Sequence, residues 1–134
     1  ASRAKYEQLC YFLMTEVDAQ ALWIHRKHEA LGQFFGSVPE AVAHARSHFA
    51  AALRVAVSEL SGAYLLQSGF SPADILLVHC CDWAQSIGWL AASGGGDCSG
   101  DSAEPLDPVL AAYLDRCRSR PAYQRALSLK KPKL

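Results

Sequence analysis

The stretch FSPADI at residues 70–75 decides the fold, because its polar positions all have a defined place at a helix start. Ser71 fits the N-cap, where its hydroxyl accepts a hydrogen bond from the Asp74 amide. Pro72 fits the first helical position, where a missing N–H costs nothing. Asp74 fits the third position, from which its carboxylate reaches back to the Ser71 amide and completes a capping box. Ser71 and Asp74 are therefore predicted to be structural capping residues.

The residues that flank this cap predict that the helix is buried. Phe70 before the cap and Ile75 at the fourth helical position can contact each other as a hydrophobic staple. A solvent-exposed helix seldom needs every one of these devices. The segment from Ser71 to Leu90 is also apolar almost all round, which favours a central place in the fold. We expect a core helix whose start is fixed before the rest of the chain packs on it.

Outward from this helix, apolar residues recur at steps of three and four, the period of amphipathic helices. We expect a long first helix over residues 2–31 and a second from Pro39 to about Leu60. A later helix is expected to have Asp107 as its N-cap, Pro108 at its first position and Leu110, Tyr113, Leu114 and Cys117 on its inner face. A last short helix is expected to run from Pro121 to near Leu127. The glycine-rich segment 91–105 is predicted to be a flexible connection. No segment reads as a strand. The sequence thus predicts a single all-α domain over residues 1–134, a bundle of about five helices.

The long first helix has two apolar faces. One runs through Leu9, Leu13 and Val17, and the other contains Tyr11, Met14 and Leu22 and is interrupted by Asp18. A helix with two apolar faces usually covers two neighbours. Asp18 is either a surface carboxylate or a polar group that faces a cleft lined by Tyr11, Met14 and Trp83. Apolar clefts with one or two polar groups are typical of small-ligand sites.

Composition narrows the possible partners. Hydrophobic residues make up 51% of the 134 residues, charged residues make up 19%, and the formal net charge is zero. A neutral chain gives no electrostatic reason to expect nucleic-acid or membrane binding. The chain contains no apolar run of membrane-spanning length, and we expect no signal peptide. The five cysteines are odd in number and scattered, which favours reduced thiols and a cytoplasmic location.

No residue pattern predicts catalysis or a metal site. His79, Cys80 and Cys81 are possible zinc ligands by type, but neighbours on a helix point about 100° apart and cannot converge on one ion. We therefore expect no metal and read the two thiols as buried packing groups. Cys98 in the glycine-rich segment is expected to be the most exposed thiol, but no nearby base would activate it.

Several of these stretches together resemble a known family. Tyr64-Leu65-Leu66 in the loop from Gly62 to Gly69, the FSPADI stretch, and Arg120-Pro121-Ala122 follow one another as in the C-terminal helical domain of bacterial cytosolic glutathione S-transferases. The resemblance covers nearly the whole chain. One departure is Gln67, which replaces the glycine that usually follows the two leucines.

The resemblance implies a fold and an activity for the parent protein. It implies a thioredoxin-like N-terminal domain that binds glutathione and supplies the catalytic residue, so this chain alone would be inactive. The helical domain would bind a small apolar electrophile, to which the intact enzyme adds the glutathione thiolate. The parent would be a cytoplasmic homodimer engaged in detoxification, and the second apolar face of the first helix would cover the N-terminal domain and the partner subunit.

The resemblance also implies roles for individual residues. Thr15-Glu16-Val17-Asp18 resembles a T-E-L-H segment of bacterial members, on which Glu16 would approach glutathione bound in the other subunit. Asp18 would stand where those members have a pocket histidine. Tyr11 matches a position near glutathione, and Trp83 matches a pocket tryptophan. The apolar cleft pattern described above adds Met14. The predicted substrate-binding residues are therefore Tyr11, Met14, Asp18 and Trp83.

Two other functions fit the same sequence. A free-standing interaction module of this fold would bind partner proteins and catalyse nothing. An intracellular ligand carrier would bind an apolar ligand without glutathione. A thioredoxin-like segment upstream of Ala1 in the gene would favour the enzyme, and its absence would favour the module.

Overall fold

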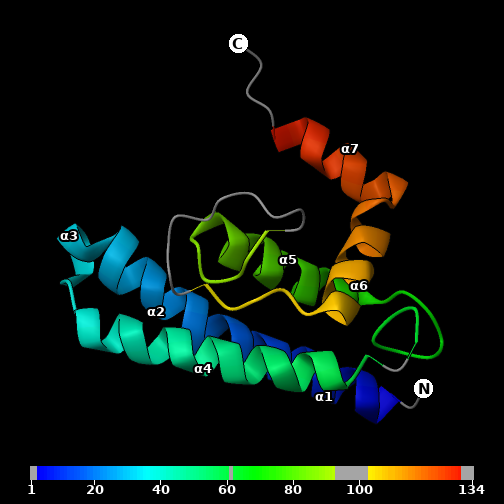
Figure 1. The fold of residues 1–134 in the computed structure, drawn as a ribbon, viewed down its shortest axis with the longest axis horizontal. Helices are drawn as coiled ribbons and strands as arrows, with labels where there is room; N and C mark the ends of the chain where they lie inside the picture. The colour runs from blue at the N-terminus through cyan, green and yellow to red at the C-terminus, as the bar shows by residue number, and fades with distance from the viewer. Residues whose placement is uncertain (1–2, 61, 93–102, 131–134) are drawn as a thin grey trace.

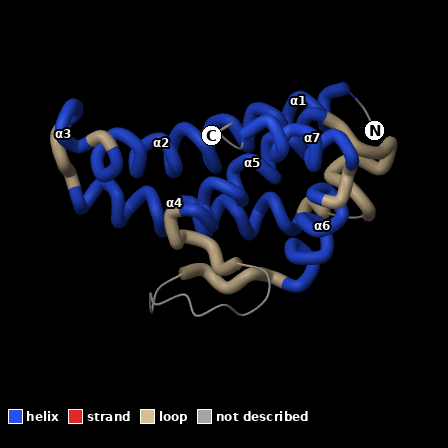
Figure 2. The backbone as a smooth tube through the Cα atoms, turned by 90° about the horizontal axis from the view of Figure 1, so that it is seen from above, coloured by secondary structure: helices blue, strands red, loops and turns tan. Residues whose placement is uncertain are grey.

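The computed structural model describes residues 3–60, 62–92 and 103–130, and within these ranges the chain is helical with no strand (Figures 1 and 2). The elements in order are α1 (Arg3–Phe12), η1 (Leu13–Leu22), α2 (Trp23–His25), η2 (Arg26–Ala30), α3 (Gly32–Phe35), α4 (Pro39–Ser58), α5 (Pro72–Ser86), α6 (Pro108–Arg118) and α7 (Pro121–Lys130). The only pairing of extended backbone in these ranges is an isolated bridge between Leu90 and Glu104. The predicted all-α class is confirmed.

The long first helix is present but is not a uniform α-helix. Residues 13–22 and 26–30 form π-helical turns, with wider i→i+5 hydrogen bonding. In an α-helix, side chains four positions apart drift by about 40° around the axis. The wider turns cancel that drift, so a row of residues at a spacing of four stays against the core. This buried row comprises Leu9, Leu13, Val17, Ala21 and His25.

The π-turns place Leu22 differently from its predicted position. Leu22, which we expected on the outer apolar face with Tyr11 and Met14, is fully buried. Tyr11 and Met14 are exposed over 68% and 52% of their surface. The two apolar faces are therefore separate in the first half of the helix. In the second half, the change of helical pitch places Leu22 in the core.

Helix α4 follows the predicted period and packs along the first helix. Its buried residues are Val42, Ala45, Phe49, Ala52, Leu53 and Ala56. Pro39 occupies its first turn as expected, whereas the N-cap is Val38 and no side chain caps the helix there. Gly36 precedes this start with a φ of 84°, a left-handed conformation that lets the chain reverse direction. α4 therefore packs against η1, α2 and η2, alongside residues 13–30 (Figures 1 and 2).

Helix α5 occupies the centre, as its composition predicted. It packs against α1, η1 and α6, and buries residues that include Ala73, Leu77, Val78, Cys80 and Cys81. It ends at Ser86, four residues before the predicted end at Leu90. Gly88, whose φ is 73°, turns the backbone out of the helix, and Leu90 pairs with Glu104 instead. The two amides that close this bridge are those of Ala91 and Glu104, each 3.0 Å from its carbonyl acceptor.

The capping box at the start of α5 is present. The Ser71 amide donates to Oδ2 of Asp74 over 2.8 Å, and the Ser71 hydroxyl also donates to Oδ2 over 3.0 Å. The Asp74 amide donates to the Ser71 carbonyl oxygen over 3.0 Å, a contact that the sequence did not predict. Ile75 is 57% exposed, and the Phe70 ring packs against Tyr64 at 5.4 Å. Phe70 therefore pairs with Tyr64 at this helix start, and its staple with Ile75 stays a prediction.

Asp74 does more than cap its own helix. It is fully buried, and its Oδ1 accepts hydrogen bonds from the Leu65 amide and the Tyr113 hydroxyl, each over 3.0 Å. Burial, followed by the Asp74 charge, raises the pKa of Tyr113, so this hydroxyl stays protonated and donates. Asp74 thus joins the loop 62–70, α5 and α6 through one carboxylate.

Helix α6 begins as predicted, with Asp107 at the N-cap and Pro108 in the first turn. The Asp107 carboxylate accepts from the Val109 and Leu110 amides over 2.8 and 3.3 Å. Its buried face comprises the four predicted residues Leu110, Tyr113, Leu114 and Cys117.

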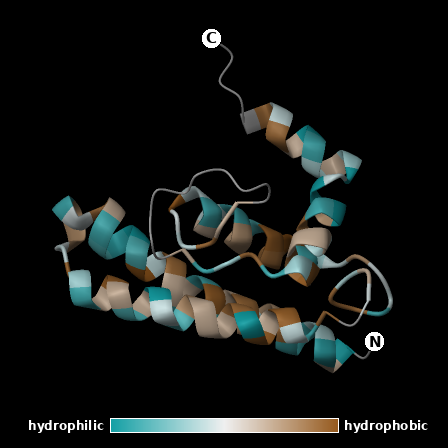
Figure 3. Cartoon of the chain, in the orientation of Figure 1, coloured by the Kyte–Doolittle hydropathy of each residue, from teal (hydrophilic) through white to brown (hydrophobic). Residues whose placement is uncertain are grey.

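Helix α7 starts at Pro121 as expected and continues to Lys130, past the predicted end near Leu127. It rises away from α4, and its ribbon carries both hydrophilic and hydrophobic residues (Figures 1 and 3). Leu127 and Leu129 are exposed over 39% and 85% of their surface. The predicted connection 91–105 and Cys98 fall largely outside the described residues. No helix in the described ranges combines the length and the apolar character needed to span a bilayer.

Candidate functional site

Asp18 is the polar residue that stands out on the side of the first helix that faces α5. It lies in η1 and is partly buried, and its Oδ1 has no hydrogen-bond partner among the described residues. Loss of solvent raises the pKa of the Asp18 carboxyl, and the nearby His79 imidazole opposes this rise. The unpartnered oxygen is itself buried, and a donor that reached it would satisfy it.

Trp83 on α5 is the centre of an aromatic and cationic cluster next to Asp18. The Trp23 ring meets it edge-on at 6.2 Å, and the His79 ring lies 6.1 Å away. The Arg26 guanidinium stands 5.1 Å from the Trp23 ring and 5.9 Å from the Trp83 ring. The cluster therefore joins the long first helix to α5 through flat side chains and one positive charge.

The sequence analysis did not include Trp23, Arg26 or His79 in the site. One signal was available, because Trp23 and Arg26 are three positions apart on a helix and so share a face. Their contact with Trp83 depends on how the two helices pack, which the sequence alone did not specify.

The structure places the other predicted substrate-binding residues on the outside of the first helix. Tyr11 and Met14 are exposed apolar side chains one to two turns before Asp18. Asp18 senses the charge of His79, whose ring lies 6.1 Å from that of Trp83. A common cleft of all four residues stays a prediction.

Glu16, the predicted contact to glutathione of a partner subunit, has a partner within its own chain. Its Oε2 lies 3.1 Å from Nε2 of His48 on α4, and the Glu16 side chain is 40% exposed. This contact holds the carboxylate near the junction of η1 and α4. Its predicted role toward glutathione is not tested by the geometry of one chain.

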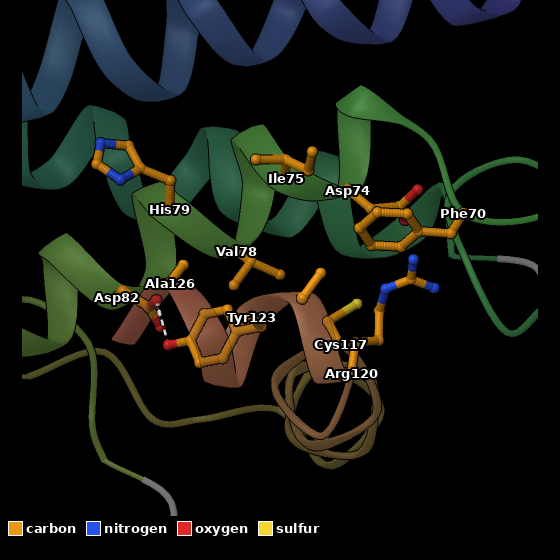
Figure 4. Close-up of a pocket in the computed structure, with 11 residues that line it drawn as sticks. Phe70, Asp74, Ile75, Val78, His79, Asp82, Cys117, Arg120, Tyr123 and Ala126 are labelled. Carbon is orange, nitrogen blue, oxygen red and sulfur yellow. Dashed lines mark hydrogen bonds between the residues drawn. The ribbon is translucent and has the colours of Figure 1, made fainter. Parts of the chain in front are cut away.

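A cavity of about 290 Å³ lies between α5, α6 and α7 (Figure 4). Val78, Tyr123 and Ala126 form much of its apolar wall. The Arg120 guanidinium lies 3.5 Å from the centre of the Phe70 ring, and the Tyr123 hydroxyl donates to Oδ2 of Asp82 over 2.7 Å. The stretches 70–75 and 120–122, which carry the family resemblance, thus meet at one cavity.

The second carboxylate oxygen of Asp82 is bound from α6. Arg118 donates to Oδ1 through Nε at 3.0 Å and Nη2 at 2.6 Å. Asp82 is thereby held on both oxygens, by Arg118 and Tyr123, and is a structural link rather than a free acid or base. Since Tyr123 is the only partly buried side chain of α7 between residues 121 and 129, this bond fixes α7 to the core.

The three buried thiols, those of Cys80, Cys81 and Cys117, are poor nucleophiles. Burial, with a smaller contribution from the Asp18 charge, raises the pKa of Cys80 to about 12. Burial also raises the pKa values of Cys81 and Cys117. Because the thiolate is the reactive species, these cysteines act as packing groups at neutral pH. Within the described ranges, no three histidine, cysteine or acidic side chains gather around a point that would hold a metal ion.

No protein-family model matches the chain, and no curated protein matches it either.

Proposed function

We propose that this chain is the electrophile-binding domain of a glutathione S-transferase. The observation that carries the proposal is the unpartnered, buried Oδ1 of Asp18, which lies beside the His79–Trp83 pair and follows the exposed Tyr11 and Met14. Apolar surface with one placed polar acceptor is suited to a small, mainly apolar molecule. The sequence motifs around the buried cap at Asp74 support the family assignment.

In this proposal the chemistry is divided between two domains. A thioredoxin-like domain of the same protein binds glutathione and stabilises its thiolate, and Trp83 and Asp18 position the electrophile for attack. Glutathione supplies the nucleophile, and the raised pKa of Cys80 agrees with a packing role for that thiol. The contact between Glu16 and His48 would orient Glu16 toward glutathione across a homodimer interface.

Steady-state kinetics of the protein made from its native gene test the proposal. We expect glutathione conjugation of an activated chloroarene, and we expect Trp83→Ala to raise the KM for the chloroarene about tenfold while the KM for glutathione stays constant. We expect Asp18→Ala to lower kcat/KM for the chloroarene, and Asp115→Ala, which removes an exposed carboxylate of α6, is its matched control and should leave kcat/KM unchanged. Absence of conjugation by the intact protein would refute the enzyme assignment.

A second candidate, a non-catalytic interaction module, is favoured by apolar residues exposed away from Asp18. Phe34 and Phe35 at the turn after the first helix are exposed over 72% and 57% of their surface, and Leu129 over 85%. Exposed apolar groups often mark protein contacts. The intact mass of the native gene product separates the two functions. A mass well above the 14.6 kDa of this chain supports the enzyme, and an equal mass supports the module.

A further inference from the structure

A separate cavity of about 260 Å³ lies beyond Trp83, where the end of the first helix meets the end of α5. Its lining residues are His25, Arg26, Ala30, Leu31, Trp83 and Ile87. The volume is at the lower limit of ordinary ligand pockets, so it suits a molecule with few atoms rather than a peptide. Trp83, Leu31 and Ile87 give it flat and apolar walls.

One side of this cavity carries a positive charge without an opposite charge. No acidic side chain in the described ranges forms an ion pair with Arg26, and its guanidinium rests against the Trp23 and Trp83 rings. The two rings hold the guanidinium in place, so little side-chain freedom is lost when it binds an anion. Arginine is also the residue best shaped to bind a carboxylate through two parallel hydrogen bonds.

His25, which also lines this cavity, has a buried ring nitrogen without a partner. His25 is 8% exposed, and its Nδ1 has no hydrogen-bond partner among the described residues. The opposite ring nitrogen, Nε2, is 3.7 Å from Oε2 of Glu29, and the His25 ring packs edge-on against Trp89 at 5.4 Å. A buried ring nitrogen without a partner is costly, and a ligand oxygen or hydroxyl would satisfy it.

We propose that this cavity binds a small organic acid with a flat apolar body, such as an arene carboxylate. The carboxylate meets the Arg26 guanidinium, a ligand polar group meets His25, and the ring packs on Trp83. This site shares Trp83 with the region around Asp18 but does not depend on glutathione. Its test, binding of an arene carboxylate at Arg26, is therefore separate from the test of the proposed transferase activity.

Isothermal titration calorimetry of the full-length protein tests this site with two probes of one shape. Naphthoate carries the carboxylate, and naphthamide replaces it with a neutral amide. We expect saturable binding of naphthoate with a Kd below about 1 mM, and binding of naphthamide about tenfold weaker. Equal affinity for the two probes, or no binding of naphthoate at millimolar concentration, would overturn the proposal.

Two variants locate the binding site. Arg26→Gln is expected to weaken naphthoate binding about tenfold and to leave naphthamide binding unchanged. Lys27→Gln removes the same charge from the adjacent exposed residue, which does not line the cavity, and should change the Kd less than twofold. Equal effects of the two substitutions would show that only the net charge matters, and would refute a site at Arg26. Far-UV circular dichroism confirms that both variants are folded.

Discussion

At the scale of single residues, two carboxylates have opposite surroundings. Asp74 is fully buried and accepts four hydrogen bonds, from the Leu65 amide, the Tyr113 hydroxyl and both donors of Ser71. Asp18 is partly buried, and one of its oxygens has no partner in the described residues. A buried charge is stable only when its hydrogen bonds are made. Asp74 is therefore a structural group, and Asp18 is available to a ligand.

Replacing Asp74 with alanine should destabilise the protein more than loss of an ordinary helix cap. The substitution leaves the Leu65 amide and the Tyr113 hydroxyl buried without an acceptor, at about 1–3 kcal/mol each. We expect a loss of about 3–5 kcal/mol in the free energy of unfolding, measured by urea denaturation. Asp107→Ala is the control, because it removes a solvent-accessible cap of α6 and should cost about 0.5–2 kcal/mol. Equal losses in the two variants would contradict the role given to the buried network.

The pH dependence of the free energy of unfolding should reveal the desolvation of the Asp18 carboxyl. The pKa of the Asp18 carboxyl is raised in the folded protein. Its favourable contribution to the free energy of unfolding is therefore fully present at a pH below its pKa in the unfolded chain, and is lost as the pH rises through its pKa in the folded protein. The window starts near the ordinary value of 3.8 and extends upward. Asp18→Asn should therefore gain stability relative to the parent between about pH 3 and pH 7. Asp115→Asn, on the exposed side of α6, should follow the parent, and a constant Asp18→Asn difference across this range would refute the prediction.

At the scale of helices, the π-turns of the first helix determine which side chains are buried. The row Leu9, Leu13, Val17, Ala21 and His25 keeps a spacing of four because wide and narrow turns alternate. The same change of pitch buries Leu22 and leaves Tyr11 and Met14 outside. Helix π-turns are uncommon and often occur at functional sites, and here they lie beside Asp18 and the cavity at Arg26.

Enlarging Ala21 tests this register. Ala21 is fully buried, so Ala21→Leu should force its neighbours apart and lower the free energy of unfolding by about 1–3 kcal/mol. Ala19→Leu makes the same change at an exposed position two residues away and should stay within about 0.5 kcal/mol of the parent. Chemical denaturation of both variants gives the comparison. A neutral Ala21→Leu would mean that Ala21 does not face the core.

The element scale also shows what could be predicted from sequence. The start of α5 and the inner face of α6 were predicted correctly, since capping and the helical period depend on residues a few positions apart. The π-turns have no comparable local pattern, so Leu22 was misplaced. Two other features depend on contacts between distant segments. They are the hydrogen bond from Tyr113 to Asp74 and the cluster of Trp23, Arg26 and Trp83. Single-sequence patterns do not encode such contacts directly.

At the scale of the whole molecule, the described chain leaves several apolar side chains in contact with solvent. Tyr11 and Met14 form one such surface on the first helix, separate from the exposed Phe34 and Phe35 at its end. If the chain belongs to a homodimeric transferase, the surface at Tyr11 is the one that another domain or subunit covers. Burial of such a surface is a main source of stability in subunit association.

Charge placed on this surface should prevent self-association. We expect the protein to sediment as a dimer at micromolar concentration and Tyr11→Lys to shift it toward monomer, because a lysine opposes burial of the apolar interface. Val109→Lys introduces the same charge at a residue of α6 that is 56% exposed, and should leave the dimer intact. Sedimentation velocity measures both. A monomeric parent, or a dimer unaffected by Tyr11→Lys, would exclude this surface as the interface.

The carboxylate of Asp74 also has a consequence for the order of folding. Its Oδ2 binds donors three residues away, whereas its Oδ1 needs donors that are nine and 39 residues away. The start of α5 can form early from local contacts alone, but Oδ1 keeps its water until the loop and α6 arrive together. Burial of this one carboxylate is therefore favourable only when the loop, α5 and α6 are all in place.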